Sequence, residues 1–223
     1  MRAGLPDAVG GRLWFGVDDT AFSCHFPVYG VSTRIPAAWG DRVGQVPNGA
    51  VPYGVDASAL HFNFDSAWWI FNLVANYAYA KYAPVHAEVQ AAIVAAEARF
   101  MREAAAVERK AAALLAPGGD AQAATELLTA FTEAAGAGLV REWQALFGTL
   151  FIKYRDGFVN TQSATPVCTR PRQFNCTYRN IPDSLEAGYP SQWYGRIVAE
   201  NGDHYAVPGS GLGAGPRRTR KGL

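Results

Sequence analysis

The chain has 223 residues, of which 49% are hydrophobic and 13% aromatic, and its 20 basic and 19 acidic side chains give a formal net charge of +1. This composition excludes a chain that is disordered throughout, and the length allows one large domain or two small ones. Because opposite charges are nearly equal, no general field favours nucleic acid or an anionic membrane surface as a partner.

Two strands are predicted near the start of the chain, over residues 12–17 and 22–31. Both segments are rich in aromatic and β-branched residues, and a turn with Asp18 and Asp19 joins them. In the second segment apolar residues alternate with more polar ones, which predicts one apolar face and one mixed face. Pro27 has no N–H to give to a strand ladder, so this strand is expected at an edge or a bulge.

Cys24 and His25 are neighbours in the second predicted strand, where successive side chains point to opposite faces. They therefore cannot form the hydrogen bond that joins a nucleophile to its base, and we expect Cys24 to be a small buried thiol. The four histidines show no pair of ligands two to five residues apart, so no metal site is expected.

An aromatic helix is predicted over residues 66–83, after a connection rich in glycine and proline at residues 36–58. A helix that spans a membrane needs about 20 apolar residues, whereas this run is broken at Lys81 and stopped by Pro84. We therefore expect a buried helix rather than a membrane span.

Two long amphipathic helices are predicted next, over residues 85–116 and 121–155. Apolar residues recur in both at nearly helical spacing, Pro84 suits the first turn, and a Pro-Gly-Gly sequence separates the helices. Asp120 is expected to cap the second helix. Because the connection is so short, the two helices are predicted to form an antiparallel hairpin of roughly 45 Å. Gly136 and Gly138 weaken the second helix but allow another backbone to approach it closely.

The remaining segment to residue 207 is irregular, with short strands predicted around residues 158–161 and 197–198. No linker separates it from the preceding helices, so residues 1–207 are expected to form one unit. Residues 208–223 are rich in glycine and end in a basic run, which predicts a disordered tail; an anion-binding arm is the alternative.

The chain has three cysteines, an odd number. Cys168 and Cys176 lie where a small disulfide loop is sterically allowed, and Asn175 begins a glycosylation sequon. Together they favour a secretory or lysosomal parent protein, although sequons also occur by chance and the first residues lack the pattern of a signal peptide. The compartment therefore stays open.

Five short blocks of sequence occur in an order and rough spacing that resemble one enzyme family. The blocks are WFGVDD at residues 14–19, FPVYG at 26–30, TRIP at 33–36, DSAWWIFN at 65–72 and YRDGFV at 154–159. They resemble the cysteine dipeptidases related to dipeptidase A and, more distantly, the secernins. The resemblance covers roughly residues 10–205 and only the C-terminal part of such enzymes, and the block at 65–72 is the most specific.

The resemblance implies an α+β fold dominated by helices, as a fragment of the αββα sandwich of N-terminal-nucleophile hydrolases with the helical hairpin added. It also implies proteolysis of dipeptides: a cysteine attacks the amide, a thioester acyl-enzyme forms, and water hydrolyses it. In the family, the nucleophile is the first residue of the mature chain and its α-amino group is the base. No metal or organic cofactor is implied.

No residue of this chain is expected to be the nucleophile, because the chain opens with MRAGLP and no cysteine lies nearby. A missing N-terminal half of the enzyme is expected to supply it. Two other functions stay open: a catalytically silent fragment, or an interaction module in which the helical hairpin docks against another subunit, with a homo-oligomer as one option.

Six residues are candidates for binding the dipeptide. Asp18 and Asp19 are paired carboxylates, with turn formation as the alternative role. Arg34 lies just before Ile35 and Pro36 and is able to bind a substrate carboxylate through two N–H groups; a surface or structural ion pair is the alternative.

The other three candidates are Asn63, Asp65 and Asn72, which lie around the start of the aromatic helix. Asn76 and His61 occur in the same region. Their amides and carboxylate are able to hold a peptide terminus or an oxyanion. The alternative is that they cap the helix and join it to the preceding connection. Asn72 and Asn76 lie one turn apart, and burying either amide requires a hydrogen-bond partner.

Overall fold

A computed structural model of the protein describes residues 4–40, 62–157, 159–162, 178–180, 189 and 191–201. The chain divides into two compact units, residues 1–152 and 153–223, where the sequence predicted one unit over residues 1–207. Helices dominate the structure and each unit has one small antiparallel sheet, so the predicted helix-dominated α+β class is confirmed.

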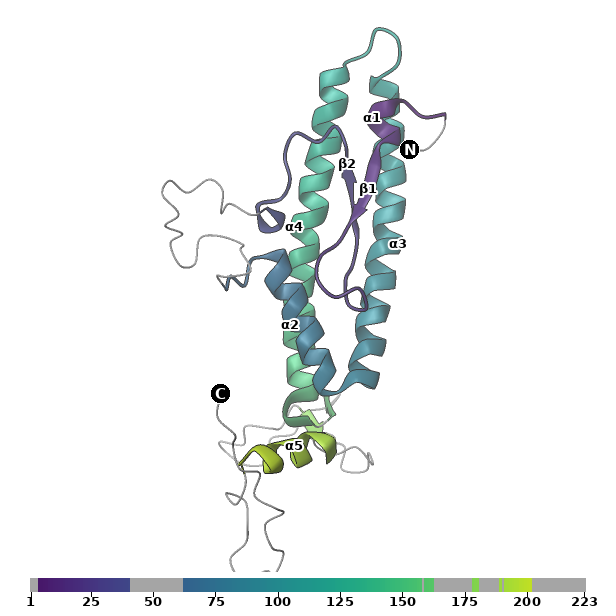
Figure 1. Cartoon of the computed structure of the whole chain (residues 1–223). Coiled ribbons are helices and arrows are strands. Elements are labelled where there is room, and N and C mark those ends of the chain that lie inside the picture. The colour runs from purple at the N-terminus through teal and green to yellow at the C-terminus, as the bar shows by residue number, and fades with distance from the viewer. Residues whose placement is uncertain are drawn as a thin grey trace, which may run out of the picture. The chain divides into compact units, whose positions relative to one another are not determined.

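Two long antiparallel helices, α3 (Tyr82–Leu114) and α4 (Ala121–Tyr154), form the frame of the first unit (Figure 1). Each has more than 30 residues and is therefore about 50 Å long. The predicted hairpin is confirmed. The backbone N–H of Ala123 donates to Asp120 Oδ1 at 2.9 Å, which is the expected N-cap. Across the hairpin, the Arg99 guanidinium pairs with Glu142 at 2.8 Å.

A two-stranded hairpin, β1 (Arg12–Phe15) and β2 (Phe26–Tyr29), lies against these two helices (Figure 1). The strands are antiparallel, with Arg12 opposite Tyr29. Both of these side chains donate to Oε1 of the buried Glu108 on α3, Arg12 at 2.7 Å and Tyr29 at 2.9 Å. Burial and this hydrogen bond raise the pKa of the Tyr29 phenol. The shared carboxylate thus fixes the strand hairpin to α3.

The second strand is shorter than predicted, because residues 22–25 belong to the connection between the strands and not to the ladder. Asp18 has a positive φ of 71°, and Asp19 Oδ1 accepts the backbone N–H of Ala21 at 2.8 Å, which makes a local turn. A Cβ at Gly16 would lie 2.7 Å from Ser23 Oγ, so the connection folds back tightly on itself.

Helix α2 (Ala67–Ala80) packs its apolar face against the frame, and Lys81 separates it from α3. Phe71 stacks on Trp143 of α4 with ring centroids 4.8 Å apart. The short helix η1 (Ala37–Trp39) adds Trp39, whose indole N–H donates to the carbonyl of Gly136 at 2.9 Å. A short helix α1 (Asp7–Gly10) precedes the strands. Within the described ranges, no helix is long and apolar enough to cross a bilayer.

The second unit contains η4 (Arg155–Gly157), β3 (Asn160–Gln162), β4 (Tyr178–Asn180) and α5 (Ser191–Asn201). Strand β3 overlaps the strand predicted at residues 158–161. The strand predicted at residues 197–198 is wrong, because these residues lie inside α5. That helix carries an ion pair between residues one turn apart, Arg196 and Glu200, at 2.9 Å.

Candidate functional site

The central contact of the candidate site joins the connection between β1 and β2 to the aromatic helix α2. Asn72 Nδ2 donates to Asp18 Oδ1 at 3.0 Å. The second oxygen of Asp18, Oδ2, is buried and has no hydrogen-bond partner among the residues that the structure describes. Buried polar atoms without partners are rare and often mark a site where a donor is normally supplied. Asp18 has a positive φ of 71°, so a sharp turn points its carboxylate toward the helix.

Asp19 is held by the same helix. Its Oδ2 accepts the phenol O–H of Tyr79 at 2.6 Å, while its Oδ1 accepts the backbone N–H of Ala21. The hydrogen bond to this carboxylate raises the pKa of Tyr79. Both oxygens of Asp19 are therefore occupied, whereas Asp18 keeps one oxygen without a partner.

Helical spacing explains why α2 reaches both aspartates. Asn72, Asn76 and Tyr79 lie at positions i, i+4 and i+7, which share one face of a helix. Asn76 Nδ2 donates to Asn72 Oδ1 at 2.9 Å and to the Asn72 backbone carbonyl at 2.9 Å. The amides that the sequence left without known partners are thus bonded to each other and to Asp18.

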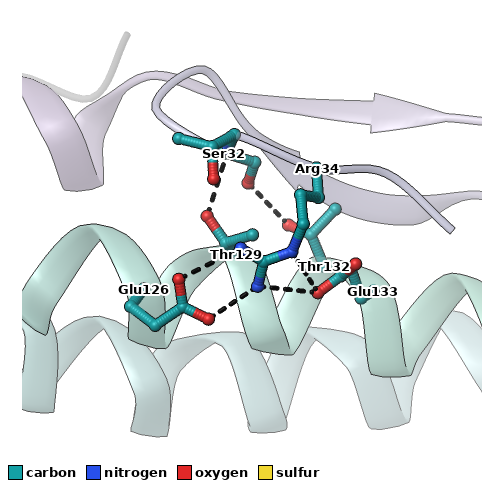
Figure 2. Close-up of polar contacts among 7 residues, drawn as sticks. Ser32, Arg34, Glu126, Thr129, Thr132 and Glu133 are labelled. Atoms are coloured by element: carbon teal, nitrogen blue, oxygen red, sulfur yellow. Dashed lines mark hydrogen bonds and ion pairs between the residues drawn. The ribbon is translucent and has the colours of Figure 1, made fainter.

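Arg34 lies in an ion-pair network on α4 (Figure 2). Its guanidinium N–H groups donate to both oxygens of Glu126, at 2.6 and 3.2 Å, and to Oε2 of Glu133, at 3.1 and 3.2 Å. These bonds raise the pKa of Arg34 and lower that of Glu126. Two carboxylates of the chain therefore occupy most of the donors that a substrate carboxylate would need.

Two hydroxyl contacts beside Arg34 complete the attachment of this segment to α4 (Figure 2). Ser32 Oγ lies 3.1 Å from Thr132 Oγ1, and the backbone N–H of Thr33 donates to Thr129 Oγ1 at 3.2 Å. The segment that follows β2 therefore contacts successive turns of α4.

Asn63 and Asp65 organise the start of α2. Asn63 Oδ1 accepts the backbone N–H of Asp65 at 2.9 Å, and its carbonyl accepts the N–H of Ser66 at 3.0 Å. Gln144 Nε2 on α4 donates to Asp65 Oδ1 at 3.0 Å. The bonds of Asn63 make a local turn, and the bond from Gln144 attaches the residues just before α2 to α4, about two turns before Asn72.

A second polar pair, which the sequence did not indicate, lies at a surface depression of about 470 Å³ lined by Trp14, His25, Glu97 and Met101. Glu97 Oε1 accepts the backbone N–H of His25 at 3.0 Å and lies 2.9 Å from His25 Nδ1. The partner carboxylate is 72 residues away in the chain, so no local spacing could have revealed the pair.

Cys24 is fully buried, in contrast to the partly exposed side chain of His25. Burial, reinforced by the negative charge of Glu97, raises the pKa of the Cys24 thiol to about 12. A thiol with so high a pKa carries almost no thiolate near neutral pH. The prediction of a small buried thiol is confirmed.

Several predicted residues lie outside the described part of the chain: Cys168, Cys176, Asn175, His61 and the tail 208–223. Among the described residues, no group of three His, Cys, Asp or Glu side chains is arranged to hold a metal ion. Comparison with protein-family models, with curated proteins and with solved structures found no match for this chain.

Proposed function

We propose that this chain is the C-terminal part of a cysteine-type dipeptidase, a hydrolase of the N-terminal-nucleophile class related to dipeptidase A. The proposal rests first on the order of the five sequence blocks that resemble this family. It adds to the confirmed helix-dominated α+β class a finer assignment, in which β1 and β2 form part of the sheet of an αββα sandwich and α2, α3 and α4 form a helical layer.

The observation that carries the proposal is the hydrogen bond between Asn72 and Asp18. Asp18 lies in the block at 14–19 and Asn72 ends the block at 65–72, which is the most specific of the five, and the two residues are 54 positions apart in the sequence. Motifs that are distant in sequence but share a hydrogen bond form one local site, as a functional constellation requires. The unpartnered Oδ2 of Asp18 lies at the same place.

In the proposed reaction, Asn72 touches the dipeptide and Asp18 orients Asn72. The side-chain nitrogen of Asn72 has two N–H groups, and one of them donates to Asp18. The second has no partner among the described residues, which leaves it able to donate to the carbonyl oxygen of the scissile amide. As the thiolate adds to the carbonyl carbon, negative charge develops on that oxygen, and a fixed donor stabilises the charge. The leaving amine takes the proton that the nucleophile's α-amino group removed from the thiol, and water then hydrolyses the thioester to release the acid and regenerate the thiol.

The nucleophile of the proposed reaction is not Cys24, because a buried thiol with a pKa of about 12 neither ionises nor reaches a substrate. We propose that polypeptide outside this chain supplies it. Two features support an additional polypeptide. Strands β1 and β2 pair only with each other among the described residues, so neither outer edge has a ladder partner there, and Leu13 of β1 is 60% exposed.

The experiment that tests the proposal uses this chain expressed together with the polypeptide encoded in frame immediately upstream, called here the extended protein. We expect the extended protein to hydrolyse simple dipeptides and to lose this activity when an early cysteine of the upstream segment is replaced by alanine. An upstream segment without a cysteine, or hydrolysis that survives the replacement, contradicts the proposal. The 223-residue chain alone is expected to be inactive and is the control.

A further inference from the structure

The side chain of Asn76 donates to Asn72, the residue that in turn donates to Asp18. Asn76 is exposed and lies one turn after Asn72 on α2. Its side-chain nitrogen donates to two acceptors of a single residue, Asn72 Oδ1 and the Asn72 backbone carbonyl, each at 2.9 Å. Asn76 is therefore fixed relative to the helix backbone and offers a donor to Asn72 Oδ1.

The hydrogen-bonding capacity of each group sets the direction of the chain of bonds. An ionised carboxylate only accepts hydrogen bonds, so Asn72 presents its nitrogen to Asp18. Its oxygen then points to Asn76, which meets it with a donor. If the Asn72 carboxamide turned over, an oxygen would face the Asp18 carboxylate and a nitrogen would face the Asn76 nitrogen, and both bonds would be lost.

We infer that Asn76 is a positioning residue, which holds the Asn72 carboxamide in the one orientation that leaves the second Asn72 N–H directed away from Asp18. The inference rests on the proposed function, because it gives that N–H its role toward the dipeptide carbonyl. Hydrogen bonds in a series also polarise one another, so the donor from Asn76 strengthens the hydrogen bond from Asn72 to Asp18 and holds the carboxamide more firmly in this orientation.

The first test needs no catalysis and uses the 223-residue chain labelled with ¹⁵N. The two side-chain N–H signals of Asn72 are assigned by their loss in Asn72→Asp, and they are expected to be widely separated in the unmodified protein. In Asn76→Ala, the Oδ1 of Asn72 loses its donor, so we expect the two signals to converge and their exchange with water to accelerate about tenfold or more. Asn76→Gln keeps an amide donor one turn away and is expected to restore part of the separation.

The thermal stability of Asn76→Ala distinguishes a positioning role of Asn76 from a merely structural one. Alanine has a higher helix propensity than asparagine, and position 76 is exposed, so Asn76→Ala is expected to leave the thermal midpoint unchanged or to raise it. Gln122→Ala, which removes an exposed amide from α4, is the matched control and is expected to leave the Asn72 signals in place. Unchanged Asn72 signals in Asn76→Ala would overturn the inference, whatever the catalytic result.

The second test uses the extended protein and separates failure of the inference from failure of the proposed function. If Asn76 acts through Asn72, Asn76→Ala lowers kcat/KM about tenfold, and the double variant Asn72→Ala with Asn76→Ala is no worse than Asn72→Ala alone. Additive losses overturn the positioning role. If Asn72→Ala itself leaves kcat/KM unchanged while the Asn72 signals respond to Asn76→Ala, the positioning geometry stands and the proposed role of Asn72 fails.

Discussion

Asn72 on α2 donates a hydrogen bond of 3.0 Å to Asp18, which lies in the turn between β1 and β2. Hydrogen bonds to charged groups contribute more than neutral ones, typically about 1.5–3 kcal/mol, and partial exposure reduces this. We expect Asn72→Ala to lower the free energy of unfolding by about 1 kcal/mol, measured by urea denaturation, with Gln122→Ala as the control. A variant as stable as the unmodified protein would show that the contact does not hold the turn against α2.

Replacing either of two glycines of α4 by alanine is expected to change the stability of the protein, in opposite directions. A Cβ at Gly136 would lie 2.6 Å from Pro36 Cγ and 2.8 Å from Phe26 Cε2, whereas a Cβ at Gly138 meets only the end of the Arg141 side chain at 3.9 Å. We expect Gly136→Ala to destabilise the protein by about 1–3 kcal/mol through overpacking. Gly138→Ala is expected to stabilise it by up to about 1 kcal/mol through helix propensity. Differential scanning calorimetry measures both, and equal effects would contradict the close approach at Gly136.

Glu108 is the buried carboxylate that fixes β1 and β2 to α3 through Arg12 and Tyr29. Removing one partner of a buried ion pair leaves the other charge uncompensated, which typically lowers stability by about 3–5 kcal/mol. We expect Glu108→Ala to lower the free energy of unfolding by about 3 kcal/mol. Glu103→Ala removes an exposed carboxylate five residues earlier on α3 and is expected to change it by less than about 0.5 kcal/mol. Similar losses in both variants would argue against the role of Glu108.

The ion pairs of Arg34 are expected to depend on pH. The guanidinium lowers the pKa of Glu126 below its usual 4.5, so the contact stabilises the folded protein above that pH and is lost as the pH falls through the lower, folded value. We therefore expect Arg34→Met to be less stable than the unmodified protein at pH 7 and about equally stable at pH 2. Urea unfolding at both values measures the difference. Since both partners are exposed, about 1 M salt should also reduce it, and a difference that persists at pH 2 contradicts the assignment.

The sequence predicted the helical part of the fold because its signals are local. Regular apolar spacing, the Pro-Gly-Gly break and the cap at Asp120 place both long helices within three residues of their observed ends. The second strand was predicted too long because residues 22–25 have strand-like composition, whereas they belong to the connection between the strands, where Asp19 makes a local turn and Asp18 contacts α2.

The candidate site was only partly accessible from the sequence. Asp18 and Asn72 were each recognised as candidates by residue type and by motif, but their contact depends on how the turn meets α2. The contacts of Glu97 and Glu108 could not be predicted, because their partners lie 72 or more residues away and a single sequence contains no signal for such pairs.

The measurement that tests the account most directly is the kcat/KM for dipeptide hydrolysis, per folded molecule, of Asn72→Ala in the extended protein. Loss of one donor to the developing oxyanion typically lowers the rate by about 100-fold. We predict a loss of that size, with Gln122→Ala unchanged as the control. A variant that loses stability but hydrolyses dipeptides at the unmodified rate per folded molecule would contradict the account.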